Sequence, residues 1–67
     1  FNVNAPGHPF FLKTTTGVGS DNQIDDVTNN GSENATISWT VPSGSSGITF
    51  YYACSLHASM YGSIIIL

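Results

Sequence analysis

The sequence predicts an all-β fold in one small domain that comprises residues 1–67. Apolar and polar residues alternate with a period of two in several short segments, and no 11-residue window shows helical periodicity. Charged residues make up only 7% of the chain, so Ser, Thr, Asn and Gly must form the polar surface, as is typical of extracellular β-structure. A chain of this length buries only about 60% of its unfolded surface, so a bound metal or a partner would contribute strongly to stability.

The first half of the chain predicts two extended segments around a corner. Residues 1–4 alternate, residues 5–9 contain the Pro and Gly of a corner, and residues 10–16 form a strand. Residues 17–34 follow as a polar loop that contains every carboxylate.

Residues 35–41 alternate most cleanly and predict a strand whose other face carries hydroxyl side chains. Pro42 ends this strand because it cannot donate a ladder hydrogen bond, and residues 43–47 form a flexible turn. The apolar face of the strand consists of Ala35, Ile37, Trp39 and Val41.

Residues 48–54 predict the next strand, and residues 63–67 predict the last one, after Gly62. With the earlier segments these make five or six strands. The strand at 48–54 is expected to place its final thiol on an inward face. That face consists of Ile48, Phe50, Tyr52 and Cys54. Trp39, Phe50 and Tyr52 are expected to be core residues.

The charge pattern excludes several classes of function. The net charge is −3 and Lys13 is the only Lys or Arg, so neither nucleic-acid binding nor a polybasic membrane anchor is expected. The longest apolar run, residues 64–67, is too short to span a bilayer. The acidic residues lack the spacing of a calcium-binding loop, which favours a solvated acidic loop. These residues are Asp21, Asp25, Asp26 and Glu33.

Metal-binding chemistry is suggested by the spacing of three side chains near the C-terminus. Cys54, His57 and Met60 follow one another at intervals of three. They would span roughly 20 Å if extended, so they can share an ion only if the loop curls. A thiolate, an imidazole and a weak thioether suit copper, and the second imidazole that such a site needs can come only from His8.

Residues 51–64 resemble the copper loop of plastocyanin-type cupredoxins: an aromatic strand, C-x-x-H, Met, Gly and a closing strand. The short His57–Met60 gap is similar to that of amicyanin, and His8 precedes Cys54 by 46 positions, about where the family has its first histidine. The resemblance implies a small Greek-key β-sandwich or barrel, one type 1 (blue) copper ion, and single-electron transfer in an extracytoplasmic compartment.

The resemblance also implies the role of each ligand. His8, His57 and Cys54 would form a trigonal plane around copper, with Met60 as the weak axial ligand. The carbonyl of Gly7 could approach the metal axially, as in azurin-like sites. A redox protein partner would dock near His57, which is expected to lie closest to the surface.

The chain departs from the family in three ways. It is reduced on its N-terminal side, so another copy or an adjacent domain could cover the truncated sheet. Pro9 occupies the place of an Asn whose backbone N–H bonds the copper-bound sulfur, which should lower the reduction potential. Ala53 stands where plastocyanins have a Tyr used in docking.

Three alternatives remain beside an electron-transfer protein. Zinc could occupy the site, although a thioether is a poor fourth ligand for zinc. A structural or adhesion β-module is also possible, as in similar modules of large surface or virion proteins of marine microbes and phages, with copper incidental or stabilising. An enzyme with Cys54 as nucleophile and His57 as base is disfavoured, because no residue is placed to orient the imidazole.

Overall fold

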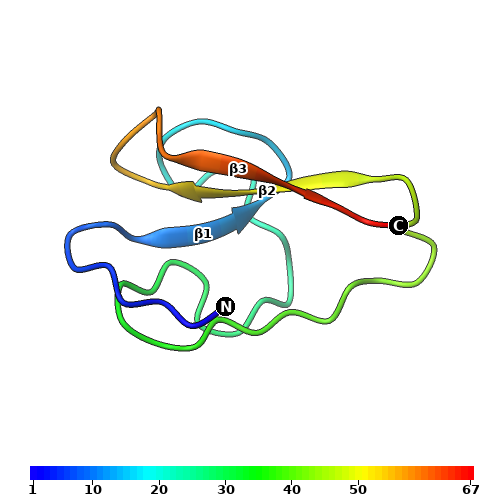
Figure 1. Ribbon diagram of the computed structural model, residues 1–67, viewed down its shortest axis with the longest axis horizontal. Helices are drawn as coiled ribbons and strands as arrows, with labels where there is room; N and C mark the ends of the chain where they lie inside the picture. Colours follow the sequence, from blue (N-terminus) through cyan, green and yellow to red (C-terminus); the bar gives the residue numbers. More distant parts are fainter.

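The computed structural model describes residues 1–67 and confirms an all-β chain (Figure 1). Three strands form one antiparallel sheet in the order β1-β2-β3: β1 at Phe10–Lys13, β2 at Thr49–Cys54 and β3 at Tyr61–Ile65. No segment is helical, so the structure offers no helix with the length and apolarity needed to cross a membrane.

The register of the sheet places a strand from the first part of the chain beside the two strands near the C-terminus. Phe10 of β1 lies opposite Cys54 of β2, and Tyr52 of β2 lies opposite Gly62 of β3. The β1–β2 ladder continues one step beyond the strands, because the N–H of Ser55 donates to the carbonyl of Pro9 at 3.1 Å. The residues just before β1 are therefore held against the residues just after β2.

The outer edge of β1 is closed by the long connection between β1 and β2. The N–H of Phe10 donates to the carbonyl of Ser32, and the carbonyl of Phe10 accepts from the N–H of Gly31. The side-chain amide of Asn30 acts as a strand would, because it accepts from the N–H of Leu12 at 2.7 Å and donates to the carbonyl of Leu12 at 3.1 Å. Every outward backbone group of β1 at these positions has a partner.

A second layer without regular strands packs on the sheet. Residues 1–5 run antiparallel to residues 33–37, with hydrogen bonds at alternate residues such as that from the N–H of Val3 to the carbonyl of Ala35. Between the layers lies a small core of Leu12, Ile24 and Ile37, bordered by partly buried apolar side chains. These bordering residues are Val3, Phe10, Val27, Trp39, Phe50 and Ile64.

The prediction of five or six strands is wrong, and the strand expected at 35–41 does not form. Its backbone partners change along its length: Ile37 bonds to Phe1, Ser38 bonds to Thr28, and residues 39–41 join no ladder. A regular strand needs one neighbour over several residues, and this segment has two neighbours for about two residues each. Its alternation nevertheless holds from Ala35 to Thr40, since Ile37 is fully buried and Ala35 and Trp39 are partly buried, while the residues between them are exposed. The alternation fails at Val41, which is exposed.

The other strand predictions need smaller corrections. β1 ends at Lys13 rather than residue 16, β2 begins at Thr49, and the last strand starts at Tyr61 and ends at Ile65. The inward face predicted for β2 is buried only at Cys54 and half-buried at Phe50; Ile48, just before the strand, and Tyr52, between Phe50 and Cys54, are exposed. The ring of Tyr52 stacks on Phe10 beside Cys54 and is therefore only partly covered.

Candidate metal centre

Cys54 is the last residue of β2; its thiol is free, and the residue is buried, with 5% of its surface exposed. The alternation of β2 turns its side chain toward the face that carries Phe10 and Phe50. Its backbone is held on the other side as well, because the N–H of Cys54 donates to the carbonyl of Met60 at 2.9 Å. The thiol is therefore fixed at the point where the sheet ends and the ligand loop begins.

His8 reaches the thiol because of the corner that precedes β1. The N–H of His8 donates to the carbonyl of Ala5 at 2.9 Å, which closes a tight turn, and Gly7 adopts a positive φ of 81° that favours glycine. The N–H of Gly7 donates to a carboxylate oxygen of Glu33 at 2.6 Å, which anchors the corner to the second layer. The β1–β2 register then places His8 beside Cys54, 46 residues later in the sequence.

His57 and Met60 lie on the turn that joins β2 to β3. The N–H of Met60 donates to the carbonyl of His57 at 3.0 Å, and together with the bond from Cys54 to Met60 this curls the loop as the spacing requires. The side chain of His57 is exposed, and Met60 is 44% exposed. The loop is also held by the connection between β1 and β2, because the N–H of Gly19 donates to the carbonyl of Ser55 at 2.7 Å.

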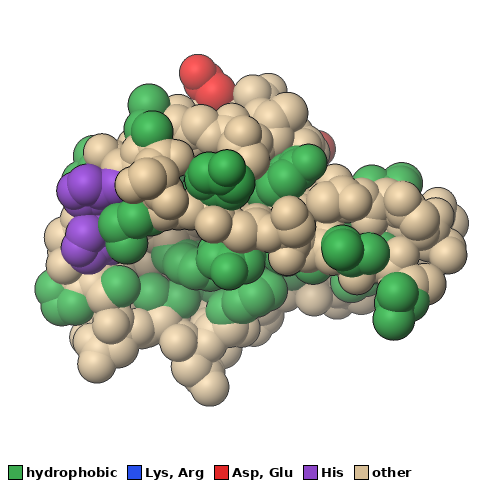
Figure 2. Space-filling model, turned by 45° about the horizontal axis from the view of Figure 1, so that its top comes forward, with side chains coloured by type: hydrophobic (Ala, Val, Ile, Leu, Met, Phe, Trp, Pro, Cys, Tyr) green, Lys and Arg blue, Asp and Glu red, His purple; other side chains and the backbone are tan.

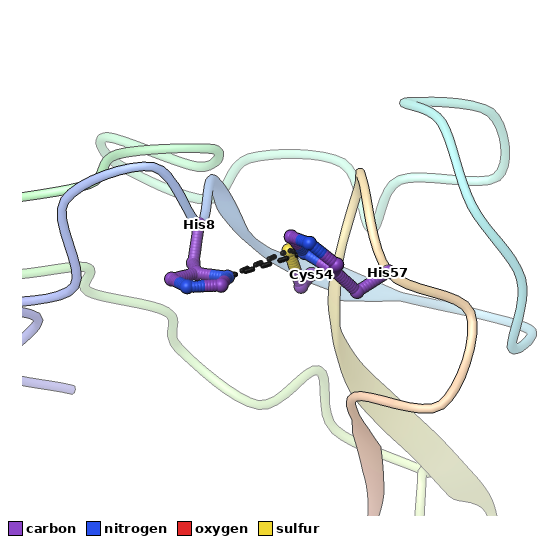
Figure 3. A group of neighbouring side chains, drawn as sticks. All are labelled: His8, Cys54 and His57. Carbon is purple, nitrogen blue, oxygen red and sulfur yellow. Dashed lines mark hydrogen bonds between the residues drawn. The ribbon is translucent and has the colours of Figure 1, made fainter.

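The three nitrogen and sulfur donors converge (Figure 3). The Sγ of Cys54 lies 3.3 Å from the Nδ1 of His57 and 3.7 Å from the Nδ1 of His8, and the two Nδ1 atoms are 3.2 Å apart. The ring centroids of the histidines are 4.7 Å apart, with a tilt of 43° between the planes. Three potential ligand atoms thus come from two remote stretches of chain to one point.

These separations fit a metal ion. An ion roughly 2.0–2.3 Å from each nitrogen and sulfur would leave its donors roughly 3.3–3.8 Å apart in a tetrahedral or trigonal arrangement. The three donors already lie within 4.8 Å of one another. The group His8, Cys54 and His57 could therefore hold a metal ion with little movement, and its softness suits copper or zinc more than calcium or magnesium.

Met60 lies beside this group, in the wall of an apolar hollow of about 300 Å³ that also reaches His8 and Cys54. The stacked rings of Phe10 and Tyr52, with centroids 5.5 Å apart, form another wall. Figure 2 shows the two histidines side by side at one end of the molecule, with hydrophobic side chains next to them. Met60 as axial ligand and the Gly7 carbonyl as a further one both stay predictions.

Sequence reasoning missed the residues that support this centre. Glu33 was expected in a solvated acidic loop, yet it anchors the corner that carries His8. Lys13, the single basic residue, is 1% exposed, and its Nζ donates to the carbonyls of Gly17 and Gly19 at 2.9 and 3.2 Å. A lone cation on an otherwise apolar strand was the one available signal for the second of these roles.

Comparison with known proteins identifies no relative of this chain. Neither a family model, nor a curated protein, nor a solved structure matches the chain.

Proposed function

We propose that this chain is a reduced cupredoxin-type module that binds one copper ion and transfers single electrons. The observation that carries the proposal is the convergence of the thiol of Cys54 and the imidazoles of His8 and His57, with all three separations between 3.2 and 3.7 Å. Two imidazoles and one thiolate, with a thioether available for a long axial bond, are the donor set of blue-copper sites. Met60 is the thioether in the wall of the neighbouring hollow.

The chain's own residues supply what electron transfer needs. When bound, copper would supply a one-electron couple. The backbone hydrogen bonds at Cys54, Met60 and Ser55 hold the ligand loop in place, which limits ligand movement between oxidation states. Burial of the Cys54 thiol keeps water from the sulfur. In this proposal these features keep the ligand loop rigid and shield the sulfur, while His57 stays open to solvent.

His57 provides the route for electrons to a partner. Its side chain is exposed, whereas Cys54 is buried, so the imidazole is the ligand nearest to an incoming protein. Leu56 and Met60 beside it are 63% and 44% exposed and form an apolar rim. A rim of this size suits a brief contact with a redox protein, since weak redox encounters typically bury less than about 1,200 Å². We place this exchange in an extracytoplasmic compartment, in keeping with the low charge.

A structural β-module is the second candidate, and the exposed sheet favours it. Only seven of 67 residues are buried, and apolar side chains such as Ile48 and Ile65 are 46% and 66% exposed. A chain of this kind would gain stability from a neighbour in a larger assembly, and a metal at the same ligands would then act as a staple.

Titration of the metal-free chain with copper(II) separates these functions. Electron transfer predicts an intense blue absorption at one equivalent and a reversible redox wave in voltammetry. Zinc serves as the matched control, because it should compete for the ligands and remove the colour without a redox wave. A chain that stays folded and colourless with copper(II) contradicts the electron-transfer proposal and supports the structural module.

A further inference from the structure

The two edges of the sheet differ in their hydrogen bonding: the outer edge of β1 has partners, and the outer edge of β3 has none. β2 exchanges hydrogen bonds with β3 at even-numbered positions, as the flanking bonds Cys54–Met60 and Ile48–Ile66 show. In an antiparallel ladder the residues between these positions point their N–H and C=O groups to the other side. On β3 these are Tyr61, Ser63 and Ile65, and none of them takes part in a backbone hydrogen bond outside the sheet.

This unpaired edge is also apolar and unprotected. Tyr61 and Ile65 are 54% and 66% exposed, and residues 60–67 contain no charged side chain and no proline. Free edges of native sheets are usually blunted by Lys, Pro, a bulge or a covering loop, and β1 shows the last of these devices. β3 has none of them, so its edge is a template for another strand.

We propose that the edge of β3 pairs with β3 of a second copy of this chain, antiparallel, around a two-fold axis at Ser63. In this register Ser63 faces Ser63 of the second copy, and Tyr61 faces Ile65 in both directions. All three outward residues of β3 then find partners, whereas a register moved toward either end of the strand leaves one of them outside β3. The strand edge is therefore self-complementary, as a two-fold interface requires.

The chemistry of the edge favours a second copy over a charged partner. Each copy carries a net charge of −3, and all four carboxylates lie between residues 21 and 33, outside the pairing strand. The proposed contact brings together two neutral strips, and it sets an aromatic ring beside a β-branched side chain across the strands, which is a favourable cross-strand pair. The contact would extend each sheet from three strands to six.

The proposal does not depend on a metal. The axis passes between the two Ser63 residues, and antiparallel pairing places the two His57 side chains at opposite ends of the joined strands, so they do not meet across the axis. A failure of copper binding would leave the pairing unchanged, and a failure of pairing would leave the ligand group unchanged.

Proline and alanine at position 63 form a matched test. Ser63→Pro removes an N–H that points outward and makes no hydrogen bond within the chain, so the internal ladder keeps all its bonds. Ser63→Ala removes only the hydroxyl. In sedimentation equilibrium the native chain and Ser63→Ala should show a concentration-dependent monomer–dimer equilibrium, and Ser63→Pro should dissociate at least about tenfold more readily. The proposal is overturned if Ser63→Pro associates as readily as the native chain. It is also overturned if the native chain is a monomer at every concentration, in which case the edge of β3 would be free to pair with a strand of a different protein.

Engineered thiols test the register. Residues in a hydrogen-bonded antiparallel pair have Cα atoms about 5.5 Å apart, which a disulfide can bridge. Ser63→Cys should therefore form a covalent dimer on mild oxidation, linked through position 63 in peptide mapping, while Ile65→Cys should not, because two copies of residue 65 lie far apart around this axis. Cys54 is buried and should not compete. Equal cross-linking of both variants would disprove the register.

Discussion

The backbone N–H of Cys54 donates to the carbonyl of Met60 at 2.9 Å, so the first and last residues of the C-x-x-H-x-x-M loop are tied to each other. The N–H of Met60 in turn donates to the carbonyl of His57 at 3.0 Å. These two bonds set the curvature of the loop through the backbone alone. The position of the ligands therefore follows from the fold, and a metal would find them close to their final places.

Cys54→Ser tests the thiolate as the principal ligand. Replacement of Sγ by a hydroxyl removes the soft, anionic donor but keeps the backbone bond to Met60. The variant should lose the blue absorption, and its copper(II) affinity in a competition titration should fall by more than about 100-fold. Unchanged affinity would mean that the metal sits elsewhere. Circular dichroism of the metal-free variant shows whether the fold is kept.

Met60→Leu tests the axial role of the thioether. The weak axial bond contributes little to binding and more to the potential, so the variant should stay blue and its reduction potential should rise by on the order of tens of millivolts. Leu56→Ala is the matched control, because Leu56 is 63% exposed in the same loop and is not a proposed ligand. If Met60→Leu lost copper altogether, the axial assignment would be wrong.

The ligand group illustrates how far sequence can lead. The spacing of Cys54, His57 and Met60 required a curled loop, and the structure contains that curl. The closeness of His8 could be expected only from the need for a second imidazole and from the family resemblance, since His8 and Cys54 are 46 positions apart and are joined by the pairing of β1 with β2. The partner of Glu33 could not be foreseen, because it is a backbone N–H 26 positions earlier in the chain. Lys13 stood out only as a lone cation on an apolar strand, and nothing in the sequence showed that its ammonium binds the carbonyls of Gly17 and Gly19.

Lys13→Met tests the buried ammonium as a support of the ligand loop. Lys13 is 1% exposed and holds the carbonyls of Gly17 and Gly19, and the N–H of Gly19 holds the carbonyl of Ser55. Methionine keeps the apolar length but leaves two carbonyls without their donor, which should lower the free energy of unfolding by about 1–3 kcal/mol. Chemical denaturation measures the loss, and hydrogen exchange should speed up at the Gly19 amide.

A matched control for this variant is Thr16→Met, an exposed position for which the structure shows no side-chain hydrogen bond. It should change the unfolding free energy by less than about 0.5 kcal/mol. A Lys13→Met variant as stable as this control would show that the ammonium contributes nothing to the loop.

Gly62→Ala tests a close cross-strand approach. Gly62 of β3 lies opposite Tyr52 of β2, and a Cβ built on Gly62 would overlap the phenol ring of Tyr52. The clash should lower the free energy of unfolding by about 1–3 kcal/mol. This loss should disappear when a second substitution removes the ring of Tyr52. The double variant Gly62→Ala, Tyr52→Ala should therefore lose less than the sum of the single variants in a double-mutant cycle. Additive losses would mean that the ring gives way without cost.

The segment at 35–41 shows where alternation stops being informative. Its period of two correctly placed Ile37 in the core, yet a strand also needs a neighbour along its whole length. Here Ile37 bonds to the N-terminal segment and Ser38 to Thr28, so the ladder breaks after single bridges. Pairing is a property of the whole fold, whereas the side-chain pattern records only which face is buried.

Pro9→Ala tests whether the missing N–H tunes the sulfur. Pro9 precedes β1 next to His8 and cannot donate to the Cys54 thiolate, while its carbonyl is already used by the N–H of Ser55 at 3.1 Å. Alanine keeps that carbonyl and adds an N–H. A new hydrogen bond withdraws electron density from the thiolate and disfavours the oxidised ion, so the reduction potential should rise by on the order of tens of millivolts.

Pro6→Ala, a substitution at an exposed position in the same corner, is the matched control and should leave the reduction potential unchanged. Equal shifts in both variants would point to a loosened corner as the cause, and no shift at Pro9 would show that the added N–H does not reach the sulfur.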